Sequence, residues 1–294
     1  MKKSVRGLIH ISWVALVMTD MVCAQDFFDI PVANLPSSVT LETGGDAVGS
    51  RNLTLQTDAG LPSGMRIRAG YATARIDTSS INYRSDTVWA GLNSDPLNAF
   101  SYGATYQGME RDDGIHSKSA KVNLRWRFND WKLAVYPELR SLTLNETRIT
   151  QKNKVRSAEV TLRSPGVGVG ITFNGWQLWT LELRQFAYRY DTDAQTLRSY
   201  PAFAQQTVSR VDQAFDASRT GISVDHALPW GSVGAEATRS LSAIDHQAAR
   251  SIDVNLSWDV SRAWNVFAHL GRSSADGVGA SGFASAGATW MWDE

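Results

Sequence analysis

A strict alternation of polar and apolar residues runs through positions 121–128, which read Lys121-Val122-Asn123-Leu124-Arg125-Trp126-Arg127-Phe128. The same period of two returns at Ser251–Val260, Arg66–Ala69, Glu159–Arg163 and Leu53–Gln56. Successive side chains of a β-strand point to opposite faces, so each segment would present one apolar and one strongly polar face. The pattern predicts an all-β protein.

Segment length separates a membrane barrel from a soluble β-sandwich. The alternating segments run over about 10–15 residues, whereas strands of globular proteins most often have about 5–6. A strand that crosses a bilayer needs about 9–11 residues. A sandwich also alternates, with its apolar face against a second sheet, but segments of this length favour the membrane barrel.

The connections between segments alternate between short turns and longer charged loops. Outer-membrane barrels have this rhythm, with short periplasmic turns and longer extracellular loops. Treating Val155–Phe173 as one strand bent at Ser164-Pro165-Gly166 gives fourteen strands, with twelve or sixteen as alternatives. The short turns are expected at Leu61–Gly64, Ser94–Pro96, Asn129-Asp130, Asn174-Gly175, Leu228-Pro229 and Ser261-Arg262, and the long connections at Gly44–Ser50, Asp77–Asn82, Arg111–Ser117, Arg148–Asn153, Asp191–Ser218, Ile244–Ala249 and Ser273–Gly279.

Tryptophans gather at the short-turn ends of the segments. Amphipathic rings collect at membrane interfaces, where they form a girdle around a barrel. Tyr71, Tyr83, Tyr188 and Tyr190 lie near the long-loop ends and would supply a second girdle. The expected tryptophan girdle consists of Trp126, Trp131, Trp176, Trp230, Trp258, Trp264, Trp290 and Trp292.

With these features the chain resembles a bacterial outer-membrane β-barrel, and in size it is similar to the small monomeric fourteen-stranded porins. The resemblance is one of pattern over residues 38–292 and rests on no motif specific to one family. It implies a transmembrane, antiparallel, up-and-down barrel that sits in outer-membrane lipid and is inserted by the barrel assembly machinery. Many such proteins end on an aromatic residue, whereas here Asp293 and Glu294 follow Trp292.

The first 24 residues have the features of a secretory signal peptide. Lys2, Lys3 and Arg6 precede an apolar run at 8–18 that is too short to span a bilayer, and Ala24 suits a cleavage site. A membrane anchor and a lipoprotein modified at Cys23 are the alternatives. Residues 25–37 would then form a periplasmic segment, with a tail, a partial plug or a docking peptide as its possible roles.

Composition excludes several classes of protein. The 29 Lys and Arg residues balance 29 Asp and Glu residues, and the pI is near 7.0, which gives no electrostatic basis for nucleic-acid binding. A single Cys excludes a disulfide framework and any zinc site built on several thiolates. We expect neither a metal nor another cofactor.

The polar faces would line the lumen and supply its chemistry. The expected lining on the third to ninth strands is mainly basic, and the other strands add Asp225, Glu236, Asp253, Asp259 and Glu42. A basic wall favours anions, so the predicted function is a porin-like channel for small polar or anionic solutes, saccharides among them. The expected lining residues are Arg66, Arg68, Lys121, Arg125, Arg127, Lys132, Arg140, Arg163 and Arg184 with Glu138, Glu159 and Glu182.

Two other functions fit the same pattern. The barrel could belong to an envelope export system, such as one secreting exopolysaccharide, in which residues 25–37 bind a periplasmic partner. It could instead be a closed structural barrel whose lumen charges only pair with one another. The loop Asp191–Ser218 could narrow the pore through a short helix at Ala202–Phe215, or it could be a surface loop.

Histidines decide whether a barrel hydrolase is plausible. His116 and His246 fall in predicted loops, and Asp225 and His226 are adjacent on one strand, so their side chains point to opposite faces. His269 is expected to face inward, without Ser or Asp two residues away. We therefore expect no enzyme and no catalytic residue, with a partner on another strand as the open alternative.

Overall fold

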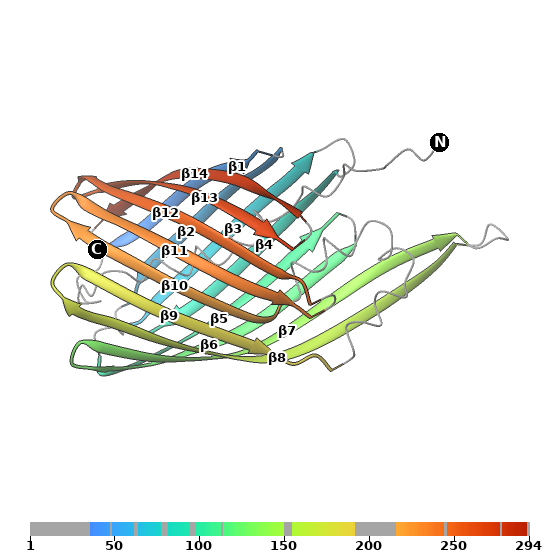
Figure 1. The fold of residues 1–294 in the computed structure, drawn as a ribbon, viewed down its shortest axis with the longest axis horizontal. Coiled ribbons are helices and arrows are strands. Elements are labelled where there is room, and N and C mark those ends of the chain that lie inside the picture. The colour runs from blue at the N-terminus through green and yellow to red at the C-terminus, as the bar shows by residue number, and fades with distance from the viewer. Residues whose placement is uncertain are drawn as a thin grey trace.

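The computed structural model describes residues 36–47, 49–61, 64–77, 82–94, 98–112, 114–149, 155–191, 216–243, 246–276 and 278–292. In these ranges fourteen antiparallel strands form one closed barrel, in which each strand pairs with its neighbours along the chain and β1 pairs with β14 (Figure 1). The predicted fold class and strand count are confirmed. The strands are β1 (Ser37–Asp46), β2 (Ser50–Gly60), β3 (Arg66–Asp77), β4 (Asn82–Asn93), β5 (Phe100–Arg111), β6 (Ile115–Phe128), β7 (Trp131–Ile149), β8 (Val155–Trp176), β9 (Trp179–Tyr188), β10 (Asp216–Leu228), β11 (Gly231–Ser242), β12 (Ala248–Ser261), β13 (Trp264–Ala275) and β14 (Val278–Trp292).

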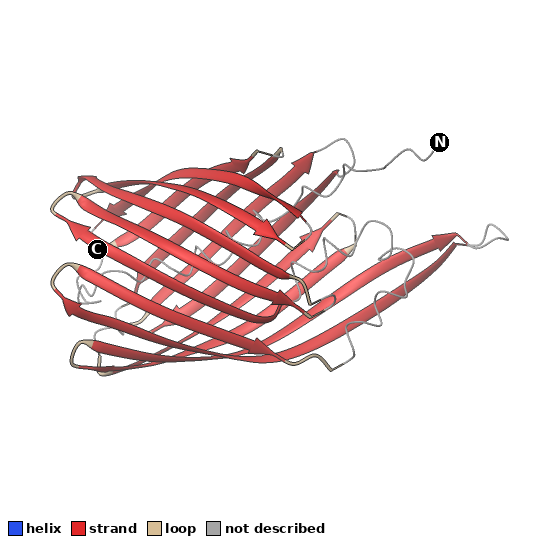
Figure 2. Cartoon of the chain, viewed as in Figure 1, coloured by secondary structure: helices blue, strands red, loops and turns tan. Residues whose placement is uncertain are grey.

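No helix within the described ranges has the length and apolar character of a membrane-spanning helix. Strands account for nearly all of the described chain (Figure 2). The expected signal peptide, most of the segment 25–37 and most of the loop Asp191–Ser218 lie outside the described residues.

The expected contrast between short turns and long connections holds only in part, because six residues (94–99) join β4 to β5 whereas two (276–277) join β13 to β14. The predicted order of the connections along the chain is correct, with small shifts in position. The largest concerns Asn174-Gly175, which the structure keeps within β8, so that the chain reverses at Gln177-Leu178. The β8–β9 register shifts between Phe173 and Trp176, which indicates a bulge that absorbs the extra residues. Leu178 takes a positive φ of 67° to close this turn.

The hairpin of β7 and β8 is longer than the others and extends beyond the rim of the barrel (Figure 1). Its register is continuous from Trp131↔Phe173 to Ile149↔Val155, so Pro165 lies within one strand, as the sequence predicted. Proline has no N–H to donate to a neighbouring strand. A second proline, Pro137 on β7, shows the effect, because the β6–β7 register passes from Lys121↔Glu138 to Leu124↔Val135 and omits Pro137.

The alternation places polar side chains inside the barrel and apolar ones outside. On β2 the side chains of Asn52, Thr54 and Gln56 are buried, whereas Leu53 and Leu55 are 44% and 49% exposed. This is the reverse of a soluble protein, in which apolar side chains form the core. An apolar surface continued around the barrel marks a contact with lipid.

Glycines on the inner wall make room for aromatic side chains of the next strand. In each case the glycine and the ring are partners in register, and a Cβ at the glycine would collide with the ring. The rings therefore lie against the wall over a gap that only glycine leaves open. These glycine–aromatic pairs are Gly70 with Trp89, Gly166 with Tyr188, Gly168 with Phe186, Gly271 with Phe283, and Gly287 with Phe267.

Candidate functional site: the lumen

The strand faces decide which of the predicted lining residues reach the lumen. Ten of the twelve have the parity of the buried polar residues on their strands and face inward: Arg66, Arg68, Lys121, Arg125, Arg127, Lys132, Arg140, Arg184, Glu138 and Glu182.

Arg163 and Glu159 correct the prediction, because they lie on the outer face of β8. Their strand neighbours with the same parity, Val167 and Val169, are each 49% exposed, whereas Leu162 is 1% exposed. Leu162 is the register partner of Leu142, which is also buried. Above the membrane both faces of the hairpin meet an aqueous surround, so the apolar residues turn inward and the charged residues turn outward.

On β2 and β3 one carboxylate holds two arginines. Asp58 bonds both Arg66 and Arg68, the latter with 3.1 Å between Arg68 Nε and Asp58 Oδ2. Arg66 Nη2 also donates to the carbonyl oxygen of Pro36 at 3.0 Å. These two arginines are thus fixed against the wall, close to the short-turn end of the barrel.

Strands β6 and β7 carry most of the positive charge. Lys121 faces Glu138 across β6 and β7, and Arg127 faces Lys132 in the same register. Like charges placed directly opposite one another repel, so this level of the wall attracts anions. Further along the wall, the Arg111 guanidinium lies 3.9 Å above the ring of Tyr83.

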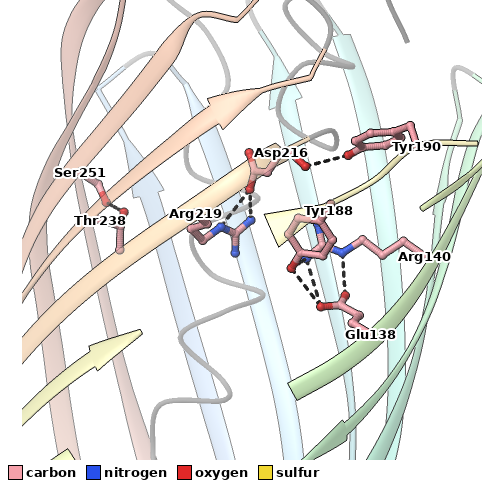
Figure 3. Close-up of polar contacts among 8 residues, drawn as sticks. All are labelled: Glu138, Arg140, Tyr188, Tyr190, Asp216, Arg219, Thr238 and Ser251. Carbon is pink, nitrogen blue, oxygen red and sulfur yellow. Dashed lines mark hydrogen bonds and ion pairs between the residues drawn. The ribbon is translucent and has the colours of Figure 1, made fainter. Parts of the chain in front are cut away.

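A network near the long-loop side joins β7, β9 and β10 (Figure 3). Arg140 Nε donates to Glu138 Oε1 at 2.6 Å, and Arg140 Nη2 donates to the hydroxyl of Tyr188 at 2.6 Å. That hydroxyl donates to Glu138 Oε2 at 3.0 Å. Beside this trio, Arg219 Nε donates to Asp216 Oδ2 at 2.9 Å.

Of the four tyrosines expected to form a second girdle, only Tyr71 lies on the outer face of the barrel, where it is 37% exposed. Tyr83 and Tyr188 are 2% and 9% exposed and face inward. Tyr190, just beyond the end of β9, donates to the carbonyl oxygen of Asp216 at 2.8 Å, and burial raises its pKa above the ordinary value. Sequence reasoning also missed Arg219. It has the same parity on β10 as the buried Gly221 and Ser223, and this alternation along the strand could have identified it as inward-facing.

The opposite wall is acidic. Arg184 bridges Glu182 at 3.4 Å and Glu236 at 2.8 Å. Glu236 is the register partner of Asp253, so two carboxylates face each other there. Glu42 and Asp225 add to this wall, as predicted from the sequence. The lumen therefore has a positive side on β3–β7 and a negative side on β9–β12 and β1.

His269 and the groups of possible metal ligands bear on whether the lumen could carry out hydrolytic or metal-dependent chemistry. His269 faces inward, as expected, with Asn255 and Ser285 as its register partners. Its Nδ1 is buried and has no hydrogen-bond partner among the described residues. In the same part of the chain, no group of three or more His, Cys, Asp or Glu side chains could hold a metal ion.

The predicted tryptophan girdle lies at the short-turn end. Seven of the eight rings are between 39% and 60% exposed, and Trp292 is half-buried beside Trp290, at 4.9 Å between ring centroids. Neighbouring rings contact one another, as do Trp131 and Phe173 at 4.6 Å. Apolar outward side chains continue from this belt along the strands.

A closed barrel with a polar interior, an apolar exterior and an aromatic belt satisfies every backbone polar group within a bilayer. The chain is a fourteen-stranded outer-membrane β-barrel. The turns expected to be short and both ends of the barrel sequence lie on one side, and the other connections lie on the opposite side. In outer-membrane barrels these are the periplasmic and the extracellular side.

The chain is similar to several solved structures at very low sequence identity. The chain is similar to the KdgM porin, with 8% identity, a TM-score of 0.42, and 87% of this chain and 99% of that chain covered. For OmpT of Vibrio cholerae the values are 9%, 0.46, 88% and 98%, and for a bacterial polysaccharide outer membrane secretin they are 10%, 0.46, 87% and 98%. No protein-family model and no curated protein matches the sequence.

Proposed function

We propose that the barrel is an outer-membrane channel for small polar or anionic solutes, saccharides included. The segregation of charge in the lumen carries this proposal. Arg125 and Arg127 on β6 and Lys132 on β7 line one wall, while Glu236 and Asp253 line the wall across from them. Rings of Arg and Lys favour anions, and opposed charged walls impose a field across the path of a solute.

The width of the barrel fits this role. Eight strands give an interior that side chains just fill, and the diameter grows roughly linearly with strand number. The glycine–aromatic pairs, such as Gly168 with Phe186, keep bulky rings against the wall. Both features support an interior wider than the side chains fill.

Conductance across a planar bilayer with a salt gradient tests the proposal. We expect stable current steps and a reversal potential on the anion-selective side. R125Q/R127Q should shift the reversal potential toward cations, and D225N/D253N should shift it toward anions. The double variant R51Q/R163Q removes the same charge as R125Q/R127Q from the outer face of β2 and β8 and should leave the potential unchanged. Silence from a folded, inserted barrel, or equal potentials in all variants, would overturn the proposal.

We further propose that residues 1–24 are a cleaved export signal and that residues 25–37 remain in the periplasm. The charged start and the short apolar run support this. N-terminal sequencing of the protein from outer membranes should begin at Gln25. A chain that retains Met1 would contradict it.

A further inference from the structure

Strands β11, β12 and β13 repeat one pattern on their outward faces. Each has a girdle tryptophan at its periplasmic end, or directly before it in β11, and an exposed arginine eight or nine residues away. The pairs are Trp230 with Arg239, Trp258 with Arg250, and Trp264 with Arg272. Only apolar side chains occupy the outward positions between them: Val233, Ala235, Ala237, Ile252, Val254, Leu256, Val266, Ala268 and Leu270.

The three arginines gather on one patch, here called the outer arginine cluster. Arg239 and Arg250 are direct register partners, and Arg272 is the partner of Ile252, which puts it diagonal to Arg250. Directly opposite Cβ atoms lie about 5 Å apart and diagonal positions about 7–8 Å apart. One doubly charged group could therefore contact all three guanidiniums.

The barrel supplies no counter-charge for this cluster. Across the described parts of β10–β14, the outward positions carry no carboxylate, and the three guanidiniums form no ion pair or hydrogen bond with any described residue. Outward Arg84 on β4 differs, because Asp86 pairs with it at 3.0 Å and Tyr71 bonds that same carboxylate. Like charges directly opposite repel, so the cluster calls for an external anion.

Its height places the cluster at the extracellular boundary of the lipid. Eight residues span about 26 Å along a strand, which is roughly 20 Å of height at a tilt of 35–45°. The apolar band of such barrels is about 25 Å tall. With Trp258 at the periplasmic interface, the Cα of Arg250 therefore lies about 5 Å inside the opposite edge of this band. A long arginine side chain extends from such a position to the headgroups of the outer leaflet.

We propose that the outer arginine cluster binds the phosphate groups of the outer-leaflet lipid, a phosphorylated glycolipid. The guanidinium fork matches phosphate oxygens in a bidentate geometry. The apolar column below each arginine would contact the acyl chains of the same lipid. Free phosphate shares the headgroup chemistry but lacks the chains, so it would bind far more weakly.

The test uses the purified full-length barrel in detergent, titrated with diphosphorylated lipid A, with dephosphorylated lipid A and with inorganic phosphate. Bound lipid is counted by native mass spectrometry, and the thermal midpoint is recorded. R239Q/R250Q/R272Q is compared with R163Q/R189Q/R262Q, which removes the same charge from exposed arginines elsewhere. We expect the cluster variant to bind diphosphorylated lipid A at least about tenfold more weakly, through loss of charge-assisted bonds, and the control variant to match the unmodified protein.

Three results would overturn the proposal: equal affinity of the two variants for diphosphorylated lipid A, equal affinity of the unmodified protein for the dephosphorylated lipid, or binding of free phosphate as tight as that of the lipid. Folding of each variant is checked by the heat-dependent mobility of the barrel on gels. Without lipid, the cluster variant should be at least as stable as the unmodified protein, because its substitutions remove repulsion.

Discussion

At the scale of single residues, the trio of Glu138, Arg140 and Tyr188 shows how buried charges in the lumen are satisfied by hydrogen bonds and an ion pair. Glu138 has a side chain only 8% exposed and is hydrogen-bonded to Arg140, with Lys121 as a second positive charge on the neighbouring strand. R140Q leaves that carboxylate partly unsatisfied and should lower the free energy of unfolding by about 1–3 kcal/mol. Urea unfolding in lipid vesicles measures it. E138Q/R140Q should recover part of the loss, and a double variant less stable than R140Q would contradict this account.

The faces of individual residues were predictable wherever the strand lies within the membrane. There the alternation of Lys121, Arg125 and Arg127 with apolar residues fixes the inner face. The same pattern misled at Arg163 and Glu159, because the β7–β8 hairpin leaves the membrane and the apolar side of its strands turns inward. Pairings such as Arg140 with Tyr188 join residues 48 positions apart, and no local pattern encodes them.

At the scale of elements, the extension of the β7–β8 hairpin depends on Leu142 and Leu162, which are 5% and 1% exposed. L162A removes a buried side chain, and such changes cost about 2–5 kcal/mol. Because the site lies in the extension, we expect local opening with the barrel intact. Limited proteolysis should cut this hairpin faster in L162A, while L139A, at a position 56% exposed, should behave like the unmodified protein. Loss of the whole barrel in L162A would contradict a local role.

At the scale of the whole molecule, stability depends on which side of the wall meets lipid. Val254 is outward and 48% exposed, midway between Trp258 and Arg250, and its neighbour Asn255 faces the acidic side of the lumen. V254R should lower the free energy of unfolding in bilayers by about 2–4 kcal/mol, as expected for Arg at the midplane of the lipid face. N255R places the same charge in a polar lumen and should cost much less. Equal losses would mean that the two faces meet similar surroundings.

The glycine–aromatic pairs specify the register between strands, which the apolar side chains of the outer surface do not. Alanine, valine and leucine side chains facing lipid fit one another almost equally well after a slip of two residues. An aromatic ring that fits only over a glycine has no such alternative register. Gly70 with Trp89, and Gly287 with Phe267, therefore fit only in the native register. A strand paired out of register would place the ring opposite a residue that has a side chain, and the two would clash. Five such pairs at three strand interfaces, β3–β4, β8–β9 and β13–β14, therefore select the correct register of these strands from inside the barrel.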